Sequence, residues 1–267
     1  MSTKHIVITG STRGIGYGMA ETFLSLGCSV MVSGRGDEAV EKAVASLKPK
    51  YEAEHVFGLA CDVTIPEQVQ MLWDQSVEHF GKVDIWINNA GLSGAQGLVW
   101  ELSAEDAQIP IRTNILGAVY GAQVAMRGML AQGKGAIYNM EGMGSDGRKH
   151  AGLTMYGTSK YAIHYFAESL ALEAKDTSIV VGALRPGMVI TDLVTDRFKD
   201  RPEEWERAKK IFNIIADSVD NVAPWLAEKI LANQKSGVIL SYSSVWKLLW
   251  RFVSQPFVKR NLFADKS

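Results

Sequence analysis

Short apolar runs alternate along the chain with longer segments in which apolar residues recur every three to four positions. The short runs predict buried strands, and the longer segments predict amphipathic helices that pack against them. The predicted strands are residues 5–9, 29–33, 55–60, 83–88, 135–140, 178–184 and 237–242. The predicted helices are residues 17–26, 37–47, 67–80, 113–130, 156–174 and 222–231.

This alternation predicts an α/β fold, with a parallel sheet of about seven strands and helices on both faces. No second core and no repeat interrupts the pattern, so we expect a single domain over residues 1–267. Residues 191–221 break the rhythm, because they form a long, charged segment with few strand signals. An insertion of this length in a compact domain is usually functional, and we expect a lid over a binding site.

Composition restricts the possible partners. The 267 residues carry a formal net charge of −1, which gives no global attraction to nucleic acid. No apolar run approaches the roughly 18 residues of a membrane span. The first predicted strand starts near Lys4, which leaves no room for a targeting segment, so we expect a cytoplasmic protein. Cys28 and Cys61 are expected to be reduced core thiols, and no metal site is predicted.

The turn after the first predicted strand has the composition of a phosphate-binding loop. Glycines permit a sharp backbone turn and a close approach of a pyrophosphate, and the following helix start supplies unpaired N–H groups and partial positive charge. A plain tight turn is the alternative, but the strand–turn–helix context favours phosphate binding. The residues of this turn are Gly10, Ser11, Thr12, Arg13, Gly14, Ile15 and Gly16.

Two arginines predict which nicotinamide dinucleotide binds. In dinucleotide-binding folds an acidic residue after the second strand bonds the ribose 2′-hydroxyl, whereas an arginine accommodates a 2′-phosphate. Here the strand is followed by Arg35 with no carboxylate, and Arg13 lies in the phosphate turn. Two guanidinium groups suit a phosphate dianion, so the sequence predicts NADP(H). The alternative is that both are solvated surface side chains.

Tyr156 and Lys160 lie four residues apart and share one face of a predicted helix. A free tyrosine has a pKa of about 10, and a nearby ammonium group stabilises the phenolate and lowers that pKa. The pair could therefore give a proton to a carbonyl oxygen as hydride arrives, or remove one in the reverse reaction. This spacing alone is common on ordinary helix surfaces, so the interpretation depends on other motifs.

Such motifs are present, in a fixed order that extends from about Lys4 to Tyr242. They are the glycine turn 9–16, Asp62-Val63, Asn88-Asn89-Ala90-Gly91, Asn114, Tyr156 with Lys160, and Pro186-Gly187. The set resembles the classical short-chain dehydrogenases/reductases. That resemblance implies a Rossmann-type, doubly wound parallel sheet in one domain.

The resemblance also implies a role for each matching residue. Asn114 would hold a water molecule in a proton relay behind Lys160, which would also bind the nicotinamide ribose. Thr191 would bond the nicotinamide carboxamide. The other positions implied to contact the cofactor, from adenine to nicotinamide, are Asp62, Val63, Asn89, Ala90, Gly91, Pro186, Gly187 and Val189.

One departure concerns the serine that the family usually places shortly before the tyrosine, where its hydroxyl orients the substrate oxygen. That position falls on Met143, or on Gly142 when the alignment starts from Asn139. Neither residue has a hydroxyl. Ser145 is the nearest candidate, and it joins Tyr156, Lys160 and Asn114 in the predicted catalytic set. Backbone N–H groups of the glycine-rich turn could stabilise an oxyanion instead.

Residues 138–148, 186–193 and 212–217 resemble a narrower branch, the chlorophyll(ide) b reductases, which reduce a formyl group on a large, flat, hydrophobic macrocycle. We therefore expect an NADPH-dependent reductase of an aldehyde or ketone on a bulky apolar substrate. Two alternatives stay open. One is an NADP-dependent alcohol dehydrogenase of the same family. The other is a non-catalytic NADP(H)-binding sensor or scaffold, which the missing serine permits.

The C-terminal tail, residues 243–267, interleaves aromatic and basic residues such as Trp250 and Arg251. It could lie on a membrane surface or cover an apolar substrate. It could equally pack on the core or on a partner subunit, since relatives often use such segments in assembly. We expect packing within a homodimer or homotetramer, with peripheral membrane contact as the alternative. Trp205, in the lid, is a candidate for substrate contact or for an ordinary helix anchor.

Overall fold

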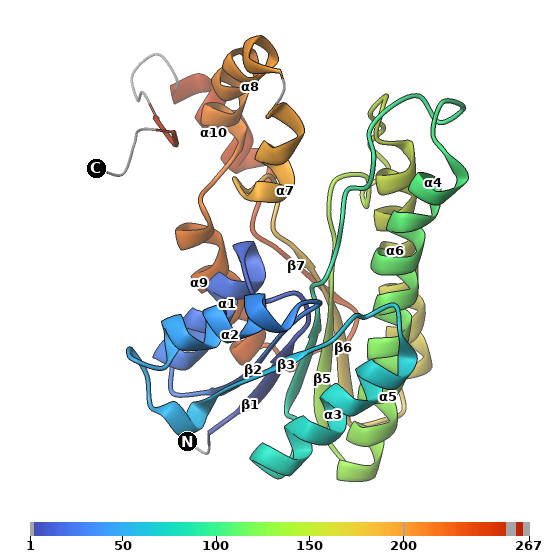
Figure 1. Cartoon of the computed structure of the whole chain (residues 1–267), viewed down its shortest axis with the longest axis vertical. Helices are drawn as coiled ribbons and strands as arrows, with labels where there is room; N and C mark the ends of the chain where they lie inside the picture. The colour runs from blue at the N-terminus through green and yellow to red at the C-terminus, as the bar shows by residue number, and fades with distance from the viewer. Residues whose placement is uncertain (1–2, 200, 255–259, 264–267) are drawn as a thin grey trace.

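A computed structural model describes residues 3–199, 201–254 and 260–263 and is built around a parallel sheet of seven strands (Figure 1). Their order is β3-β2-β1-β4-β5-β6-β7, so the chain moves from the centre to one edge, returns, and then builds the other half. The predicted doubly wound, Rossmann-type fold is confirmed. The strands are β1 (His5–Ile8), β2 (Ser29–Gly34), β3 (Val56–Ala60), β4 (Ile85–Asn88), β5 (Gly135–Met140), β6 (Ile179–Arg185) and β7 (Val238–Ser241).

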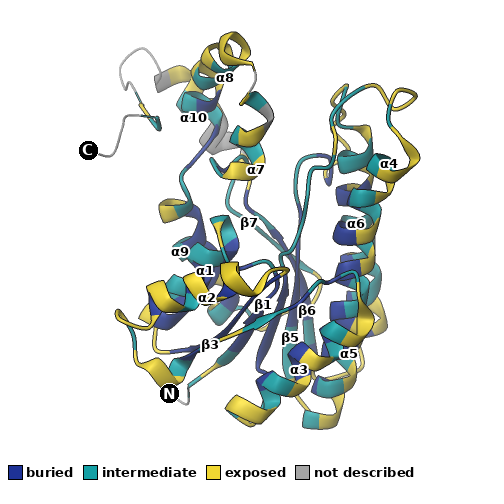
Figure 2. Ribbon diagram, viewed as in Figure 1, coloured by how far each residue is buried: buried dark blue, intermediate teal, exposed yellow. Residues whose placement is uncertain are grey.

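Helices cover both faces of the sheet, because successive side chains of a strand point to opposite sides. Ile6 and Ile8 of β1 join the core beneath one helical layer, whereas Val7 joins the core beneath the other. Figure 2 shows the buried strands between the two helical layers. The first layer contains α1 (Gly14–Ser25), α2 (Asp37–Leu47) and α9 (Val219–Ala232). The second contains α3 (Pro66–Phe80), α5 (Gly117–Gln132) and α6 (Thr154–Glu173).

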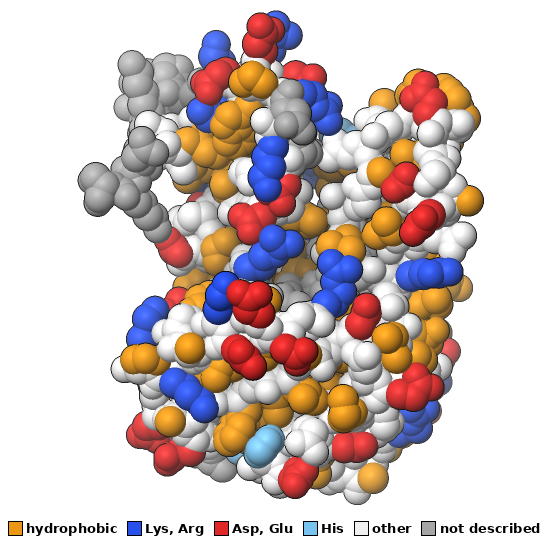
Figure 3. Space-filling model, viewed as in Figure 1, with side chains coloured by type: hydrophobic (Ala, Val, Ile, Leu, Met, Phe, Trp, Pro, Cys, Tyr) orange, Lys and Arg blue, Asp and Glu red, His pale blue; other side chains and the backbone are white. Residues whose placement is uncertain are grey.

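Two arms rise beyond the carboxyl ends of the strands, and the surface is hollowed between them (Figures 1 and 3). One arm contains α4 (Ala104–Pro110) and the start of α6. The other contains α7 (Asp192–Thr195), α8 (Pro202–Ile215) and α10 (Val245–Ser254). In an open α/β sheet, ligands bind outside the carboxyl ends where the strand order reverses, here between β1 and β4. The hollow is therefore the place to look for the site.

The structure differs from the predicted elements at the start of α5, and it adds helices α4, α8 and α10 that were not predicted. The predicted helix 113–130 does not start as an α-helix, because a π-helical turn over Ile111–Leu116 separates α4 from α5. Pro110, just before this turn, has no N–H to donate to an α-helical ladder. Residues 191–221, which we expect to form a lid and call the lid below, carry α7 and α8. Within the described part of the chain, no helix combines the length and apolar character needed to cross a membrane.

Candidate active site

The glycine turn joins β1 to α1 in a conformation that other residues would not tolerate. Gly10 and Gly14 have φ angles of +63° and +60°. A Cβ atom on Gly10 would lie 2.8 Å from Ala90 Cα, and one on Gly16 would lie 2.5 Å from Asn89 Nδ2. No side chain of the described residues caps the N-terminus of α1, so its first N–H groups are available to a ligand. The turn therefore fits a pyrophosphate on backbone donors.

Hydrogen bonds to neighbouring strands hold this turn in place. Asn89 Nδ2 donates to the carbonyl oxygens of Thr9 and Gly10, each at 2.9 Å. The Thr9 hydroxyl in turn accepts from the N–H of Asn89 at 3.0 Å. Ser11 Oγ accepts from Ser33 N at 2.9 Å, which ties the turn to β2. Asn89 and Ser11 thus shape the cradle, and the bracing Thr9 hydroxyl was not singled out from the sequence.

The two arginines lie where the sequence predicted, Arg13 just before α1 and Arg35 just after β2, and both are exposed. Arg13 Nη1 lies 3.3 Å from Asp192 Oδ2, so the phosphate turn contacts the first residue of α7. Basic side chains gather around the base of the hollow (Figure 3). An anionic group bound at this corner would meet positive charge.

The remaining predicted cofactor residues also reach the carboxyl edge of the sheet. Asp62 follows β3 and accepts from Thr64 N at 2.9 Å and from Thr64 Oγ1 at 2.8 Å. Val63 is buried, and a Cβ atom on Gly117 would lie 2.6 Å from its side chain. Thr191 lies over the phosphate turn, since a Cβ atom on Gly14 would be 3.5 Å from Thr191 Cγ2. The predicted cofactor residues that follow β6 are Pro186, Gly187, Val189 and Thr191.

Tyr156 and Lys160 project from the first turns of α6 toward the end of β5. Lys160 Nζ lies 6.0 Å from the centre of the Tyr156 ring and donates to the carbonyl oxygen of Met140 at 2.9 Å. Lys160 is buried. A Cβ atom on Gly91, after β4, would lie 3.4 Å from Lys160 Nζ. The pair therefore lies between the ends of β4 and β5, beside the phosphate turn.

The pKa values of this pair correct one expectation from the sequence. Burial raises the pKa of Tyr156 to about 12, although the Tyr–Lys spacing predicted a lowered value. The ammonium group points at the Met140 carbonyl instead of the phenol oxygen, so desolvation dominates. Burial lowers the pKa of Lys160 to about 8, and the negative charge of Glu141 opposes that shift. Tyr156 therefore keeps its proton at neutral pH, as a proton donor must.

Asn114 lies on the π-helical turn and supports the tyrosine from behind. Its Nδ2 donates to Ser159 Oγ at 2.8 Å, and Ser159 Oγ donates to the carbonyl oxygen of Tyr156 at 2.7 Å. Its Oδ1 accepts from Leu92 N at 2.8 Å. Single π-helical turns are frequent at functional sites. Ser159 was not predicted, because a serine inside a helix gives no signal of its own in the sequence.

The structure identifies Gly142 as the position that faces the tyrosine where the family usually has a serine. A Cβ atom on Gly142 would lie 2.5 Å from Tyr156 Oη and 3.2 Å from Lys160 Cγ. Ser145 is fully buried, and its hydroxyl donates to Glu141 Oε2 at 3.0 Å. The hydroxyl of Ser145 is therefore committed to a protein partner. Its catalytic role stays a prediction, and Glu141 is a site residue that the sequence did not reveal.

The described part of the C-terminal tail packs against the end of the lid, around Asp217. The buried carboxylate of Asp217 accepts hydrogen bonds from Asn221 Nδ2 at 2.9 Å and from the Tyr242 hydroxyl at 2.8 Å. It also pairs with Arg251, and with Arg260 at 3.2 Å. Burial alone would raise the pKa of Asp217, but hydrogen bonds from Arg251, Asn221 and Tyr242 lower it to about 2. One carboxylate thus joins lid, β7 and tail.

Trp205 of α8 is the centre of an aromatic cluster inside the lid. Its ring centre lies 5.3 Å from that of Phe198, 6.1 Å from that of Phe212 and 5.0 Å from that of Phe263 in the tail. Of its two expected roles, these contacts favour the anchor. Residues 257–259, which contribute to the basic and aromatic pattern of the tail, lie outside the described residues. Exposed apolar residues on α10 are Leu249, Trp250, Phe252 and Val253.

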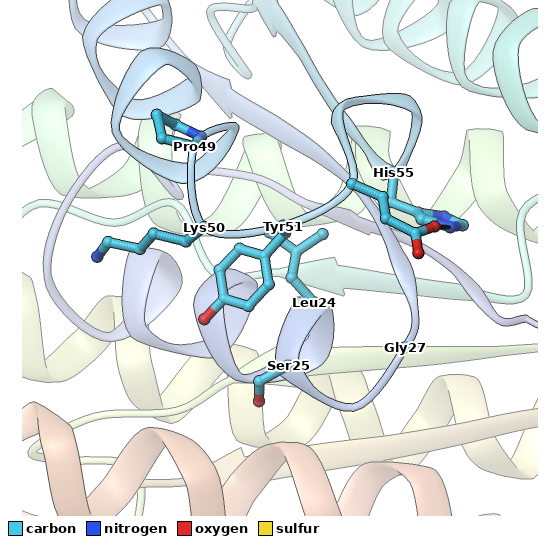
Figure 4. A pocket seen from close by; sticks show the side chains of 8 residues that line it. Leu24, Ser25, Gly27, Pro49, Lys50, Tyr51 and His55 are labelled. Atoms are coloured by element: carbon cyan, nitrogen blue, oxygen red, sulfur yellow. Dashed lines mark ion pairs between the residues drawn. The ribbon is translucent and has the colours of Figure 1, made fainter.

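A surface pocket lies at the opposite end of the sheet and contains none of the predicted site residues (Figure 4). It is lined by the end of α1 and by the segment that leads from α2 to β3. Lys50, Tyr51 and His55 are among its lining side chains. Because it is at the amino ends of the strands, it does not belong to the site between the two arms.

Comparisons with known proteins agree with this geometry. Residues 4–202 match the family model described as short chain dehydrogenase. The chain is 40% identical over 239 residues to chlorophyll(ide) b reductase NOL of Arabidopsis thaliana, which covers 87% of this chain and 67% of that protein. It is 31% identical over 279 residues to the probable chlorophyll(ide) b reductase NYC1 of the same plant, covering 98% of this chain and 55% of that protein. The chain therefore spans about two thirds of the first relative and about half of the second.

Solved structures lead to the same family. A variant of actinorhodin polyketide ketoreductase with NADPH superposes with a TM-score of 0.81 at 27% identity, covering 90% of this chain and 95% of that chain. L-sorbose reductase from Gluconobacter frateurii, complexed with NADPH and L-sorbose, gives 0.80 at 27% identity, with 91% and 96% covered. Since the family match extends over most of the chain, this protein belongs to the short-chain dehydrogenases and is an NAD(P)-dependent oxidoreductase.

Proposed function

We propose that the protein is an NADPH-dependent reductase of an aldehyde or ketone carried on a bulky apolar molecule, as in the chlorophyll(ide) b reductases it resembles. The observation that carries this proposal is the arrangement at Gly142. A protonated Tyr156 hydroxyl faces a backbone position without a side chain, 2.5 Å from where a Cβ atom would be. A carbonyl oxygen can approach the tyrosine there. The relative at 40% identity supports the substrate class.

Residues of this chain would donate the proton and stabilise the charge that it leaves behind. The chemistry supplied by a bound NADPH is hydride transfer to the carbonyl carbon. Tyr156 Oη would give its proton to the carbonyl oxygen, so that hydride and proton together yield the alcohol. The Lys160 ammonium would stabilise the phenolate left behind. Asn114 and Ser159 would hold the backbone at Tyr156 and so fix the position of the donor.

Backbone donors would orient the substrate oxygen in place of the missing serine. In the turn 142–147, the N–H groups of Ser145 and Gly147 donate to carbonyl oxygens of the turn itself, at 3.1 Å and 3.0 Å. No described residue accepts a hydrogen bond from the N–H groups of Gly142, Met143 or Gly144. Such preorganised N–H groups can stabilise developing negative charge on oxygen.

Tyr156 serves either direction of the reaction, because a catalyst accelerates reduction and oxidation alike. Burial keeps Tyr156 protonated, which is the form that reduction starts from. The ratio of reduced to oxidised cofactor would set the direction, so the alcohol dehydrogenase alternative stays open. The intact set of Asn114, Tyr156 and Lys160 argues against a purely sensing or scaffolding protein.

Assembly and location are part of the proposal. Exposed apolar side chains on α6, those of Tyr161, Tyr165 and Leu172, support a homodimer or homotetramer. The exposed apolar residues of α10 support a peripheral membrane contact as the alternative use of that surface. The two plant relatives are named as chloroplastic, so a plastid competes with the expected cytoplasm. Gel filtration, vesicle flotation and cell fractionation test these three points.

The decisive experiment follows NADPH oxidation with three carbonyl compounds: a formyl-bearing chlorophyll derivative, a bulky hydrophobic aldehyde and a small polar aldehyde. We expect kcat/KM for the bulky substrates to exceed that for the small one by about tenfold or more, because apolar contacts discriminate at this scale. Mass spectrometry should identify the alcohol product. NADPH binding without turnover of any carbonyl would overturn the proposal in favour of the sensor.

Cofactor choice is tested separately. NADPH should bind more tightly than NADH, and Arg35→Asp should narrow or reverse that difference, since a 2′-phosphate would then meet a carboxylate. Arg127→Asp makes the same charge change on α5, away from the phosphate turn, and should leave the ratio unchanged. Equal affinities of the unaltered protein for both cofactors would contradict the assignment.

A further inference from the structure

Glu141 is a buried carboxylate that the proton-transfer scheme above does not use. It follows β5 directly, and its side chain is completely shielded from solvent. Three partners from three parts of the fold converge on it. Arg185 Nε of β6 lies at 2.5 Å, His164 Nδ1 of α6 at 2.8 Å and Ser145 Oγ of the turn at 3.0 Å.

A carboxylate in this position needs an explanation, because burying a charge is unfavourable unless it is paired and hydrogen-bonded. An apolar side chain would fill the space without that penalty. The neighbours of Glu141 in the chain suggest why the charge is there. The Met140 carbonyl accepts the hydrogen bond from Lys160 Nζ, and Gly142 faces Tyr156 Oη. Whatever fixes Glu141 therefore fixes the backbone on both sides of it.

The turn after Glu141 is pressed against the catalytic helix. Ser145 N donates to the Gly142 carbonyl at 3.1 Å, so the turn closes on itself, and Ser145 Oγ ties it to Glu141. Gly144 has a φ angle of +101°, and a Cβ atom there would lie 2.7 Å from the Cα of Gly157, the residue after Tyr156. The backbone of the turn therefore packs directly against the backbone of α6, beside the proton donor Tyr156.

We propose that Glu141 is a positioning residue that clamps the turn 142–147 between β6 and α6, so that the backbone at Gly142 orients the substrate oxygen toward Tyr156. Glu141 would thus orient the substrate oxygen indirectly, through the backbone, whereas the serine hydroxyl usual in the family orients it directly. The inference rests on the proposed function, because it assigns Glu141 to the same carbonyl site. Its test therefore includes a measurement that does not depend on turnover.

Glu141→Gln keeps the shape of the side chain and removes its charge. Glu168→Gln is the matched control, because Glu168 Oε1 lies 3.6 Å from the other nitrogen of the same His164 but is exposed and does not touch the turn. We expect Glu141→Gln to lower kcat by about ten- to a hundredfold, the usual effect of a misplaced reacting group. NADPH affinity should stay within about threefold, because the phosphate turn is untouched. Glu168→Gln should change neither quantity.

Hydrogen exchange of the amides in residues 142–147, followed by mass spectrometry, is the second readout. It should speed up in Glu141→Gln and not in Glu168→Gln, whether or not a substrate has been found. Ser145→Ala removes the hydrogen bond between the turn and Glu141, and it leaves the contacts of Glu141 with Arg185 and His164 in place. It should speed up exchange in the same segment, with a loss of kcat below tenfold, and should add little when combined with Glu141→Gln.

The outcomes separate the two proposals. If the protein turns over no carbonyl compound but amide exchange in 142–147 is faster in Glu141→Gln, the proposed function is refuted and the clamp is supported. Exchange and kcat in Glu141→Gln equal to those in Glu168→Gln would overturn the inference. Faster exchange with an unchanged kcat would also overturn it, since the clamp would then not serve the reaction. If Glu141→Gln does not fold, unchanged exchange in Ser145→Ala would overturn the inference in its place.

Discussion

The two arms beside the hollow are held to the sheet by different means. On the catalytic arm, Asn114, Ser159 and Glu141 make several separate hydrogen bonds to the ends of neighbouring strands and to α6. On the other arm, the tail bonds to the carboxylate of Asp217 and also to backbone carbonyls of residues 213–216. Much of α7 and α8 is exposed, whereas α6 buries one face on the core (Figure 2).

This difference indicates a division of labour. Several separate bonds fix the backbone around Tyr156 and the turn 142–147. We propose that residues 191–221, whose bonds gather around Asp217 and an aromatic cluster away from Tyr156, can move without disturbing that geometry. Ligand-covering segments are generally drawn from the less stable parts of a fold. Changes in the catalytic arm should therefore act on kcat, and changes in the lid on stability and substrate affinity.

The largest expected effect is on the catalytic arm. Tyr156→Phe removes only the transferable proton and should lower kcat by about 10²–10⁴-fold while NADPH affinity is nearly unchanged. Tyr161→Phe, on an exposed position of the same helix, is the control and should behave like the unaltered protein. Stopped-flow and binding titrations measure both quantities. Retention of most of the kcat in Tyr156→Phe would remove this tyrosine from the mechanism.

Asp217→Asn tests the lid. The pKa of Asp217 is lowered from 3.8 to about 2, so its contribution to stability is present above pH 3.8 and is lost as the pH falls toward 2. We expect the substitution to lower the free energy of unfolding at pH 7 by about 2 kcal/mol, and to do so less near pH 2. KM for the carbonyl substrate should rise more than kcat falls.

Urea unfolding at pH 7 and at low pH measures this difference, with Asp176→Asn, an exposed residue after α6, as control. A fall in kcat as large as that in Tyr156→Phe, with KM unchanged, would end the proposed division between the two arms.

Lys160→Met tests how much stability the protein loses by burying an ammonium group in the catalytic arm. Burial lowers the pKa of Lys160 from 10.5 to about 8, so the folded protein bears the full penalty of a buried ammonium below pH 8. That penalty is relieved as the pH rises from 8 to 10.5, where the unfolded chain still binds the proton. The variant should be inactive, yet more stable at pH 7 by about 1–3 kcal/mol.

Denaturant unfolding at pH 7 and pH 10 tests this point, and the gain should shrink at the higher pH. Lys175→Met, at an exposed position, should show no such dependence. A loss of stability in Lys160→Met at both pH values would mean that the bond to the Met140 carbonyl outweighs the desolvation.

The smallest expected effect is that of Ser145→Ala. Its hydroxyl is bonded to Glu141, so the loss in kcat should stay below about tenfold, whereas loss of an oxyanion donor costs about a hundred- to a thousandfold. Steady-state kinetics, with circular dichroism and NADPH affinity as checks on folding, decide between them. A loss of a hundredfold or more would make Ser145 the working hydroxyl after all.

The sequence by itself determined the sheet and the location of the site. Its strands are short apolar runs bounded by polar or glycine-rich segments, and each predicted run lies on an observed strand, with β5 matching at both ends. In a parallel sheet all carboxyl ends meet at one edge. Residues after β1, β2, β3, β4 and β6 were therefore bound to converge, and the ordered motifs identified the family.

Only the tertiary structure decided which groups meet at that edge. Glu141 and Arg185 are 44 positions apart, and no local period shows that a glutamate after a strand is buried against an arginine of the next one. The same holds for the Asp217 centre, and for Gly142 as the position that faces Tyr156. Even the direction of the Tyr156 pKa shift depends on where Lys160 points. Periodicity encodes which face of a helix or strand is buried. Ion pairs, and the direction in which a side chain points, arise from contacts between segments that only folding brings together.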